Sequence, residues 1–485
     1  MPATDFRIEE ALAQWQPRHL VGGELLAQGA PFGVVDPSSG EVFAECPEAG
    51  VEELDCAVSS ARVAWHGWKA QPLEKRRAVL HTFAAALEEA APLIAPLLSR
   101  EQGKPLSQAE MELKVSGTHI RHLSSLPLED ELLRKDDRGA VVLNWRPLGV
   151  VGGISPWNFP VALAMHKVAQ ALYTGNTLVL KPSPYTPLAT LAVAEVAKDI
   201  FPAGVLNVLA GGNAFGAGMT AHAGIDKISF TGSVATGKRV MESASATLKR
   251  ITLELGGNDA AIVLENADLD VTAAALARSA FYNCGQICMA VKRIYAHEAV
   301  HDELAVRIAE KARALKVGSA FEEGVEMGPV QNRMQYEKVL SLLDDSKSRE
   351  GATVLAGGGA LDRPGYFIAP TVITGLDDTA PLVAEEQFGP VIPIVRVRNA
   401  EEAVERANAG NLGLGGSIWG RDGARCAELA RQLDCGTAWI NRHGVNDSDV
   451  PFGGMKESGY GREHGVMGLH SYMELQAINA IPPGN

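Results

Sequence analysis

Cysteine is scarce in this chain. Six cysteines are spread irregularly over 485 residues, at positions 46, 56, 284, 288, 426 and 435. Secreted disulfide-rich domains have denser and more regular cysteine patterns. The first fifteen residues, MPATDFRIEEALAQW, contain acidic side chains and no apolar run, so they predict neither a signal peptide nor a transit peptide. Both features favour a reducing compartment, and we expect a cytoplasmic protein.

Positive charge is also in deficit. Acidic side chains (58) outnumber basic ones (44), which gives a formal net charge of −14. Because a negative field repels phosphate backbones and anionic lipid headgroups, we expect neither nucleic acid nor a membrane as a partner. The long uncharged stretch at residues 148–165 contains three glycines, two prolines and Asn158. Such residues disrupt a membrane span, and the stretch predicts a buried strand, a loop and the start of a helix.

Alternating helical and β-prone segments are abundant. From residue 150, short apolar runs alternate with helical segments, and a second series follows residue 253. This rhythm predicts an α/β fold with doubly wound, mostly parallel sheets, whose ligands bind beyond the carboxyl ends of the strands. A nucleotide is the expected ligand there. We also predict helices over residues 53–70, 72–98 and 108–126, a projecting strand over 140–145, and an extended tail over 465–485.

Two segments are candidates for binding a dinucleotide. Thr231, Gly232 and Ser233 follow the strand KISF and precede a helix, whose free amides and positive dipole end suit a pyrophosphate. Alone, the GSxxxG pattern fits an ordinary glycine-bearing turn better than a nucleotide site. Lys181 ends the apolar run TLVLK, where its ammonium group could bind ribose hydroxyls instead of lying on the surface as a solvated charge.

Cys288 is the candidate nucleophile. The segment NCGQICMA is predicted to form a helix over residues 283–290, and a helix N-terminus lowers a thiol pKa, which favours attack on a carbonyl. A buried, inert cysteine is the alternative. Cys284 and Cys288 are one helical turn apart, but no CxxC motif or histidine group completes a metal site in the sequence, so no metal is predicted.

Two polar residues in apolar surroundings complete the candidate chemistry. Glu254 lies between leucines and precedes two glycines. Apolar surroundings disfavour a carboxylate, which tunes it towards general-base catalysis; a paired structural carboxylate is the alternative. Asn158 lies in the apolar turn SPWNFP and is suited to stabilising an oxyanion, although an asparagine often serves only to make a turn.

Together these segments resemble the aldehyde dehydrogenase superfamily over nearly the whole chain. Its motifs occur in order: SPWNFP, KPS, FTGSxxxG, ELGG, GQxC, EExFGPV and PFGGxKxSGxGRE. The resemblance implies that Cys288 forms a thiohemiacetal, that hydride passes to a nicotinamide, and that Glu254 activates the water that hydrolyses the thioester. Asn158 would hold the oxyanion. Lys167 and Glu463 match positions of a proton relay, and a structural ion pair is an equal alternative.

The resemblance also implies a cofactor site and three structural parts. Many NAD-preferring relatives have a glutamate where this chain has Pro184; we favour NAD and keep NADP as the alternative. The implied parts are a dinucleotide-binding domain (1–126 and 148–255), a catalytic domain (256–446), and a β arm with the tail (127–147 and 465–485) that forms a homodimer or homotetramer. The cofactor residues are Ile154, Ser155, Pro156, Trp157, Lys181, Ser183, Pro184, Gly211, Phe230, Thr231, Gly232, Ser233, Leu255, Gly256, Glu386 and Phe388.

The substrate is an aldehyde whose identity the sequence leaves open. The histidine and arginine side chains at the implied pocket positions favour a polar or anionic aldehyde. The alternatives are a CoA-acylating semialdehyde dehydrogenase, which commonly lacks the ELGG glutamate, a thiol esterase, and a non-enzymatic protein similar to lens crystallins. The pocket positions are His166, Ile287, Met289, Arg442, His443 and Phe452, with Cys284 beside them.

Overall fold

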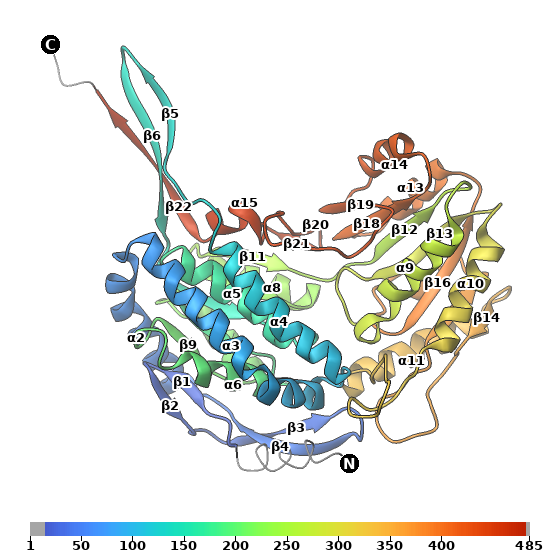
Figure 1. Ribbon diagram of the computed structural model, residues 1–485, viewed down its shortest axis with the longest axis horizontal. Helices are drawn as coiled ribbons and strands as arrows, with labels where there is room; N and C mark the ends of the chain where they lie inside the picture. The colour runs from blue at the N-terminus through green and yellow to red at the C-terminus, as the bar shows by residue number, and fades with distance from the viewer. Residues whose placement is uncertain (1–14, 482–485) are drawn as a thin grey trace.

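The computed structural model describes residues 15–481. Two α/β bodies lie side by side, and a β arm projects from the first of them (Figure 1). No signal peptide is predicted in the first fifteen residues, and residues 1–14 of this segment lie outside the described residues. The prolines at 482 and 483 also lie outside them. The predicted α/β class with largely parallel sheets is confirmed by the topology.

The first body is built on an eight-stranded sheet. Its order is β2-β1-β9-β8-β7-β10-β11-β21, and β9, β8, β7, β10 and β11 run parallel. Every residue of β7, β8 and β10 is buried, as expected for parallel strands covered on both faces. The strands are β1 (His19–Val21), β2 (Glu24–Leu26), β7 (Val150–Ile154), β8 (Thr177–Lys181), β9 (Leu206–Val208), β10 (Lys227–Thr231), β11 (Arg250–Glu254) and β21 (Gly459–Tyr460).

Helices cover both faces of this sheet. Helices α3 to α6 share one apolar cluster with the sheet, and α2, α7 and α8 share another. The three predicted N-terminal helices are confirmed with shifted ends. By length and composition α3 could cross a membrane, but it packs against α4, α5 and α6 as a core helix. The helices are α2 (Val51–Lys69), α3 (Leu73–Gln102), α4 (Leu106–Leu123), α5 (Pro160–Tyr173), α6 (Leu188–Ala197), α7 (Asn213–Ala221) and α8 (Val234–Ser245).

The second body contains a seven-stranded sheet in the order β14-β15-β16-β13-β12-β18-β19. Its strands are β12 (Asp259–Val263), β13 (Val291–His297), β14 (Thr353–Ala356), β15 (Thr371–Thr374), β16 (Val391–Val397), β18 (Gly415–Trp419) and β19 (Thr437–Ile440). Its helices are α9 (Leu269–Phe281), the 3-10 turn η1 (Tyr282–Gly285), α10 (His301–Ala314), α11 (Arg333–Ser348), α12 (Pro381–Ala384), α13 (Ala400–Asn408) and α14 (Gly423–Ala430).

The projecting arm is a three-stranded antiparallel sheet in the order β22-β6-β5. The predicted strand at 140–145 lies within β6 (Gly139–Pro147), which pairs with β5 (Glu131–Asp136) and with β22 (Met473–Ala480). The tail is therefore extended as predicted, but only after a short helix, α15 (Gly465–His470). Two further strand pairs complete the described chain: β3 (Pro31–Asp36) with β4 (Glu41–Pro47), and β17 (Leu412–Gly413) with β20 (Met455–Lys456).

One predicted helix is wrong. Residues 283–290 do not form an α-helix, because Asn283 (φ 50°), Cys284 (φ 58°) and Gly285 (φ 70°) adopt left-handed conformations in succession. Tertiary contacts hold them there: the Asn283 amide donates to the Asn158 carbonyl at 2.9 Å, and Lys292 Nζ donates to the Gly285 carbonyl at 3.0 Å. The prediction also missed α7 and the short strands β1 to β4.

Buried glutamates cap two helices that lead from the sheet. Glu112 Oε1, on α4, accepts the amides of Val161 (2.9 Å) and Ala162 (3.0 Å) at the start of α5. Its other oxygen lies 2.5 Å from the ammonium group of the buried Lys104, which also donates to the Asn158 carbonyl at 3.0 Å. Glu101 accepts the amides of Leu188 and Ala189 at the start of α6 in the same way. The carboxylates therefore satisfy amides that a helix start leaves unpaired.

Replacing Glu112 by Gln is expected to destabilise the first body strongly. The change leaves the Lys104 ammonium group buried without its anion, and breaking a buried pair in this way costs about 3–5 kcal/mol. Urea denaturation followed by tryptophan fluorescence measures the loss. Glu110→Gln on the exposed side of the same helix is the matched control, and equal midpoints for the two variants would contradict the assignment.

Candidate active site

Cys288 lies in the loop between η1 and β13, where the two bodies meet. The residue as a whole is half-buried, its thiol is enclosed by protein, and a Cβ at Gly257 would stand 2.4 Å from its carbonyl oxygen. Burial raises the pKa of the thiol to about 12, with further increases from the carboxylates of Glu386, Glu254 and Asp259 and an opposing effect of Lys292. The expected lowering by a helix N-terminus is wrong, because no helix begins at this residue. The thiol needs a base to become a nucleophile.

Asn158 is held beside the cysteine loop from both ends. Its side-chain amide donates to the Gln286 carbonyl at 2.9 Å, and its own carbonyl accepts from Lys104 and Asn283. An amide nitrogen carries two N–H groups; the second has no acceptor among the described residues. Asn158 therefore has a donor free for an oxygen near Cys288.

Glu254 ends β11 as a buried and unpartnered acid. It is 4% exposed, and neither carboxyl oxygen has a hydrogen-bond partner within the described part of the chain. A Cβ at Gly453 would stand 2.8 Å from Oε1, so only glycine leaves the acid this space. Burial, reinforced by the charge of Glu463, raises the Glu254 pKa well above its usual range. An acid so placed is tuned towards proton transfer.

Lys167 and Glu463 form a buried ion pair beside this acid. Lys167 Nζ lies 2.9 Å from Glu463 Oε1 and also donates to Ser229 (3.1 Å) and Thr231 (2.8 Å). Burial alone would raise the pKa of Glu463, but Lys167 and the hydrogen bonds outweigh it, and the net shift is downwards. The two neighbouring glutamates therefore have pKa values displaced in opposite directions, which assigns the proton to Glu254.

Glu386 lies against the glycines that follow Glu254. Its Oε1 accepts the Gly257 amide at 3.0 Å, and a Cβ at Gly256 would stand 2.4 Å from Oε2. Burial raises its pKa, opposed by Lys292 and by the Gly257 hydrogen bond. The neighbouring Asn258 donates its amide to the Val383 carbonyl at 3.0 Å. Asn258 thus tethers this loop to α12.

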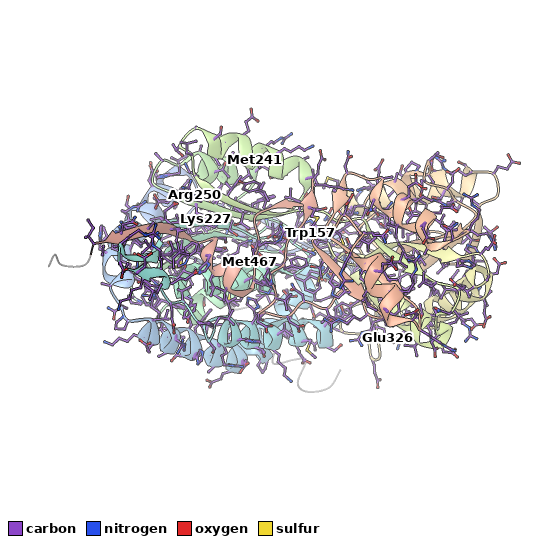
Figure 2. All side chains as sticks on the ribbon, turned by 90° about the horizontal axis from the view of Figure 1, so that it is seen from above. Trp157, Lys227, Met241, Arg250, Glu326 and Met467 are labelled. Carbon is purple, nitrogen blue, oxygen red and sulfur yellow. The ribbon has the colours of Figure 1, made fainter. Side chains whose placement is uncertain are left out.

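The rings of Phe388 and Trp157 pack together and form an aromatic wall of the site. Phe388 adopts a left-handed backbone (φ 51°), and its ring meets Trp157 edge-on at a centroid distance of 5.3 Å. Trp157 lies near the middle of the molecule, between the two bodies (Figure 2). Lys292 Nζ lies 4.8 Å from the centre of the Phe388 ring. The wall therefore offers flat apolar surface beside Glu386.

Lys181 has a carboxylate neighbour, Glu48, that was not predicted from the sequence. Lys181 is buried at the end of β8, and burial lowers its pKa to about 8, with Glu48 opposing the shift. Glu48 Oε1 accepts the Gly212 amide at 2.9 Å. Pro184 supplies no carboxylate near this lysine, whereas Glu48 does, from a segment about 130 residues earlier in the chain. No local motif around Glu48 signals this placement.

The predicted glycine turn precedes α8. Ser233 caps the helix by accepting the Thr236 amide at 3.3 Å, and a Cβ at Gly232 would stand 2.5 Å from the Phe230 ring. Phe230 and Thr231 end β10. Position 232 therefore accepts only glycine, because a side chain there would clash with the Phe230 ring. The other predicted cofactor residues also end or follow sheet strands: Ile154 ends β7, Ser155 and Pro156 follow it, Ser183 follows β8, Gly211 follows β9, and Leu255 follows β11.

The predicted substrate residues do not all gather. Ile287 and Met289 flank Cys288 and are partly exposed. His443 is turned inwards, with Nδ1 2.8 Å from Ser417 Oγ and Nε2 3.1 Å from the Met289 carbonyl. Arg442 is exposed and lies 3.8 Å from Asp447. The two adjacent polar side chains therefore face different surroundings.

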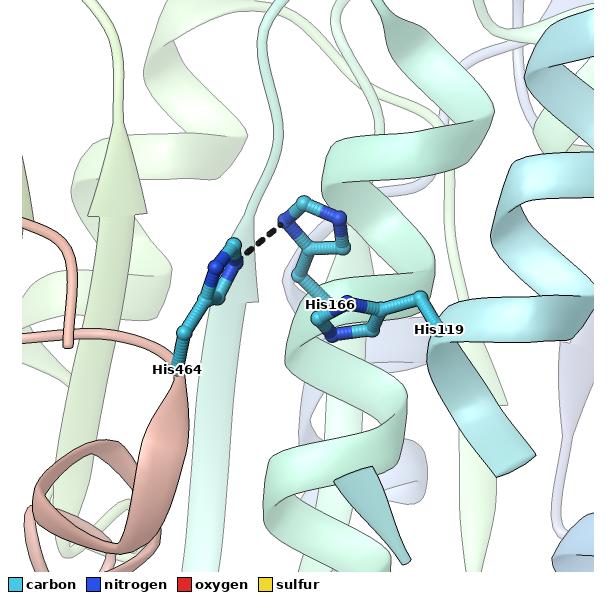
Figure 3. A group of neighbouring side chains, drawn as sticks. All are labelled: His119, His166 and His464. Carbon is cyan, nitrogen blue, oxygen red and sulfur yellow. Dashed lines mark hydrogen bonds between the residues drawn. The ribbon is translucent and has the colours of Figure 1, made fainter. Parts of the chain in front are cut away.

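The remaining two predicted pocket residues lie beside a group of histidines. The ring of the buried Phe452 is 6.1 Å from the ring of His464, and His464 Nε2 lies 3.1 Å from His166 Nδ1. His119 packs against both imidazoles (Figure 3). Burial lowers the pKa of His464 to about 4 and those of His119 and His166 well below the usual value. Sequence reasoning missed this group because its members lie far apart in the chain.

Removing the charge of Glu386 is expected to make Cys288 more reactive. Glu386→Gln deletes the largest of the carboxylate effects that raise the thiol pKa, and each unit by which the pKa falls gives about tenfold more thiolate at neutral pH. The rate of iodoacetamide alkylation at Cys288, followed by mass spectrometry, measures this. Glu385→Gln, at the exposed neighbouring position, is the control, and equal rates for both variants would refute the electrostatic assignment.

Comparison with known proteins agrees with this geometry. Residues 26–478 match the aldehyde dehydrogenase family. The chain is 37% identical over 462 residues to aldehyde dehydrogenase LUC3 from Fusarium sp, covering 95% of this chain and 98% of the relative. It is 34% identical to the solved NAD+ complex of an aldehyde dehydrogenase from Bacillus cereus, with a TM-score of 0.94 and 98% of each chain covered.

A second solved structure, lactaldehyde dehydrogenase from Escherichia coli, is 32% identical with a TM-score of 0.93, covering 96% of this chain and 99% of that one. These likenesses confirm the predicted fold class and the resemblance on which the site was assigned. The chain belongs to the aldehyde dehydrogenase family.

Proposed function

We propose that this protein oxidises an aldehyde to the carboxylic acid with NAD+, through a thioester on Cys288 that water hydrolyses. The observation that carries the proposal is Glu254, a buried and unpartnered acid with a raised pKa that acts electrostatically on the Cys288 thiol. A structural carboxylate would be expected to have hydrogen-bond partners. Its free oxygens suit a base that serves first the thiol and then a water molecule.

The residues present fit a dinucleotide. The Gly232 turn, the start of α8 and buried Lys181 lie at the carboxyl ends of the sheet strands, the usual position for such a ligand. Lys181 and Glu48 would bind the adenine ribose, the α8 amides the pyrophosphate, and Glu386 the nicotinamide ribose beside Phe388. When bound, NAD+ accepts the hydride from the substrate carbon. The Glu48 carboxylate near Lys181 disfavours a ribose phosphate, which supports NAD over NADP.

The chain's own residues supply the covalent steps. Cys288 Sγ attacks the aldehyde carbon, its proton passes to Glu254, and the Asn158 amide donates to the oxygen that becomes negative. Hydride departure leaves the acyl group as a thioester on Sγ. Glu254 releases the thiol proton to solvent and then takes a proton from water, whose oxygen attacks the thioester carbon. The carbon–sulfur bond breaks, the carboxylic acid leaves, and Sγ takes the proton back from Glu254, which restores the thiol. The charge of Glu463 favours the protonated form of Glu254 and the charge of Lys167 favours its ionised form, so the pair sets the balance between the two forms.

The substrate proposed is a polar aldehyde. His166 is partly exposed and carries the polar character expected of the pocket, since His443 is committed to Ser417 and Met289. Equal turnover of hexanal and succinic semialdehyde would contradict this substrate class without touching the reaction type.

The decisive test is NADH formation by the purified protein with a panel of aldehydes and without CoA. We expect Cys288→Ala to lower turnover by several orders of magnitude, on the order of 10⁴-fold or more as for other nucleophiles, while Cys56→Ser at an exposed position retains it. NADP+ replaces NAD+ in a parallel series. A wild-type protein that binds NAD+ but reduces none with any aldehyde would support the non-enzymatic alternative.

Glu254→Gln separates the two halves of the same reaction. We expect slow formation of at most one NADH per active site, because the same base also activates the thiol, followed by arrest with the acyl group retained on Cys288 in the intact mass. Because the base must be ionised and its pKa is raised, wild-type turnover should fall as the pH is lowered through a value above that of an ordinary glutamate. A wild-type protein that turns over only with CoA would establish the acylating alternative, and ester hydrolysis alone would leave only esterase activity.

The arm supports a proposal of homo-oligomerisation. All residues of β5 are exposed, β5 and β22 form the two edges of the arm, and Leu132, Leu133, Leu475 and Ile478 are between 45% and 59% exposed. Unpaired strand edges with apolar side chains are templates for another chain. We propose that the arm packs on a second copy, giving a homodimer or homotetramer. Separately from the arm, we propose a cytoplasmic location, as the scarcity of cysteine suggests.

Ile478→Asp is expected to shift the protein to a smaller assembly. The buried charge would destabilise the interface that the arm forms, and light scattering after size exclusion measures the molar mass. Val63→Asp, on the exposed face of α2, is the control. A wild-type protein that is monomeric at micromolar concentration would contradict the proposed role of the arm.

A further inference from the structure

Three histidines from distant parts of the chain converge beside the Lys167–Glu463 pair. His119 lies on α4, His166 on α5, and His464 directly before α15. One potential ligand nitrogen from each residue lies within 4.8 Å of the other two, and Figure 3 shows the three side chains close together, with a hydrogen bond between His166 and His464. We call these three residues the histidine triad.

Outer hydrogen bonds fix the orientation of two rings. His464 Nδ1 lies 3.1 Å from Asn446 Oδ1, and because an amide oxygen only accepts, this nitrogen carries the proton and Nε2 keeps its lone pair. His119 Nδ1 lies 2.8 Å from Ser448 Oγ. The other ring nitrogen of His464, Nε2, lies 3.1 Å from His166 Nδ1. Such outer contacts are typical of histidines that bind a metal.

One ring nitrogen of the triad makes no hydrogen bond within residues 15–481. His119 is 3% exposed, and its Nε2 has no hydrogen-bond partner within residues 15–481. Burying a polar atom without a partner is costly. The unpartnered nitrogen is therefore an independent sign that something binds at the triad.

The spacing suits a small metal ion. A tetrahedral ion with nitrogen at 2.0–2.1 Å requires its ligand atoms to be about 3.4 Å apart. His166 Nδ1 and His464 Nε2 are already 3.1 Å apart, and the potential ligand atoms of all three residues lie within 4.8 Å of one another, so a spacing of about 3.4 Å requires movements of roughly 1.4 Å at most. Imidazole nitrogens without carboxylates favour Zn²⁺, Co²⁺ or Ni²⁺ over Ca²⁺ and Mg²⁺.

We propose that the triad binds one divalent transition-metal ion through His119 Nε2, His166 Nδ1 and His464 Nε2. Binding replaces the hydrogen bond between His166 and His464 and moves the His166 proton to its Nε2. The fourth position takes a water molecule or a ligand oxygen on the partly exposed side of His166. Among the described residues, no carboxylate belongs to this group of potential ligands, and Glu463 Oε1 accepts from Lys167 and Ser229. The proposal does not depend on the proposed aldehyde oxidation.

The test uses the full-length, metal-free protein. Co²⁺ is titrated while its visible d–d absorption is recorded, and Zn²⁺ binding is measured by calorimetry. We expect one ion per chain, with no sulfur-to-metal charge-transfer band. His119→Ala should weaken binding at least tenfold, and Ser448→Ala roughly tenfold through loss of the outer contact. His122→Ala, at an exposed position of the same helix, should leave binding unchanged.

Several results would overturn the proposal. Wild-type protein that binds neither ion, or binds no more tightly than His119→Ala, excludes the site. A charge-transfer band that disappears in Cys288→Ser places the metal on the catalytic thiol instead. Should His119→Ala fail to fold, as judged by circular dichroism, Ser448→Ala carries the test, because it leaves the three rings in place; unchanged affinity in that variant counts against the triad.

Discussion

The buried ion pair between Lys167 and Glu463 is the constraint on which the rest of the site depends. Removing two charges from water is expensive, and here the cost is offset by a 2.9 Å contact and by hydroxyl groups from β10. The pair joins α5 to the chain segment that returns from the second body. Its negative member raises the pKa of Glu254, so one structural contact also sets the chemistry of the neighbouring acid.

Residues adjacent to strands and turns were predictable from the sequence. Glu254 and Lys181 end the apolar strands β11 and β8, and Asn158 follows the buried strand β7. Parallel strands bring their carboxyl ends to the same edge of a sheet. The loop around Cys288 was not predictable in the same way. Its residues have helical spacing, but Asn158 and Lys292, distant or downstream in the chain, hold Asn283 and Gly285 in conformations that no helix accepts.

The features that the sequence did not predict depend on contacts between segments that are far apart in the chain. Glu48 lies beside Lys181, and Glu112 caps α5, without any local pattern that marks them. Strands β1 and β2 have three residues each, too few for a clear alternation, and β3 and β4 show no regular alternation of buried and exposed residues. All four exist through their pairing. His443 shows the opposite error: its type suggested a pocket side chain, whereas two hydrogen bonds commit it to the interior.

The return of the chain to the first sheet has a consequence for biosynthesis. Strand β21 pairs with β11 at Glu254, and Glu463 follows it, 175 residues after Cys288 (463 − 288). A ribosome therefore exposes the cysteine loop well before the acid acquires its charged neighbour. The nascent protein holds its thiol without the completed base, and reactivity arrives only when the C-terminal segment has emerged and docked.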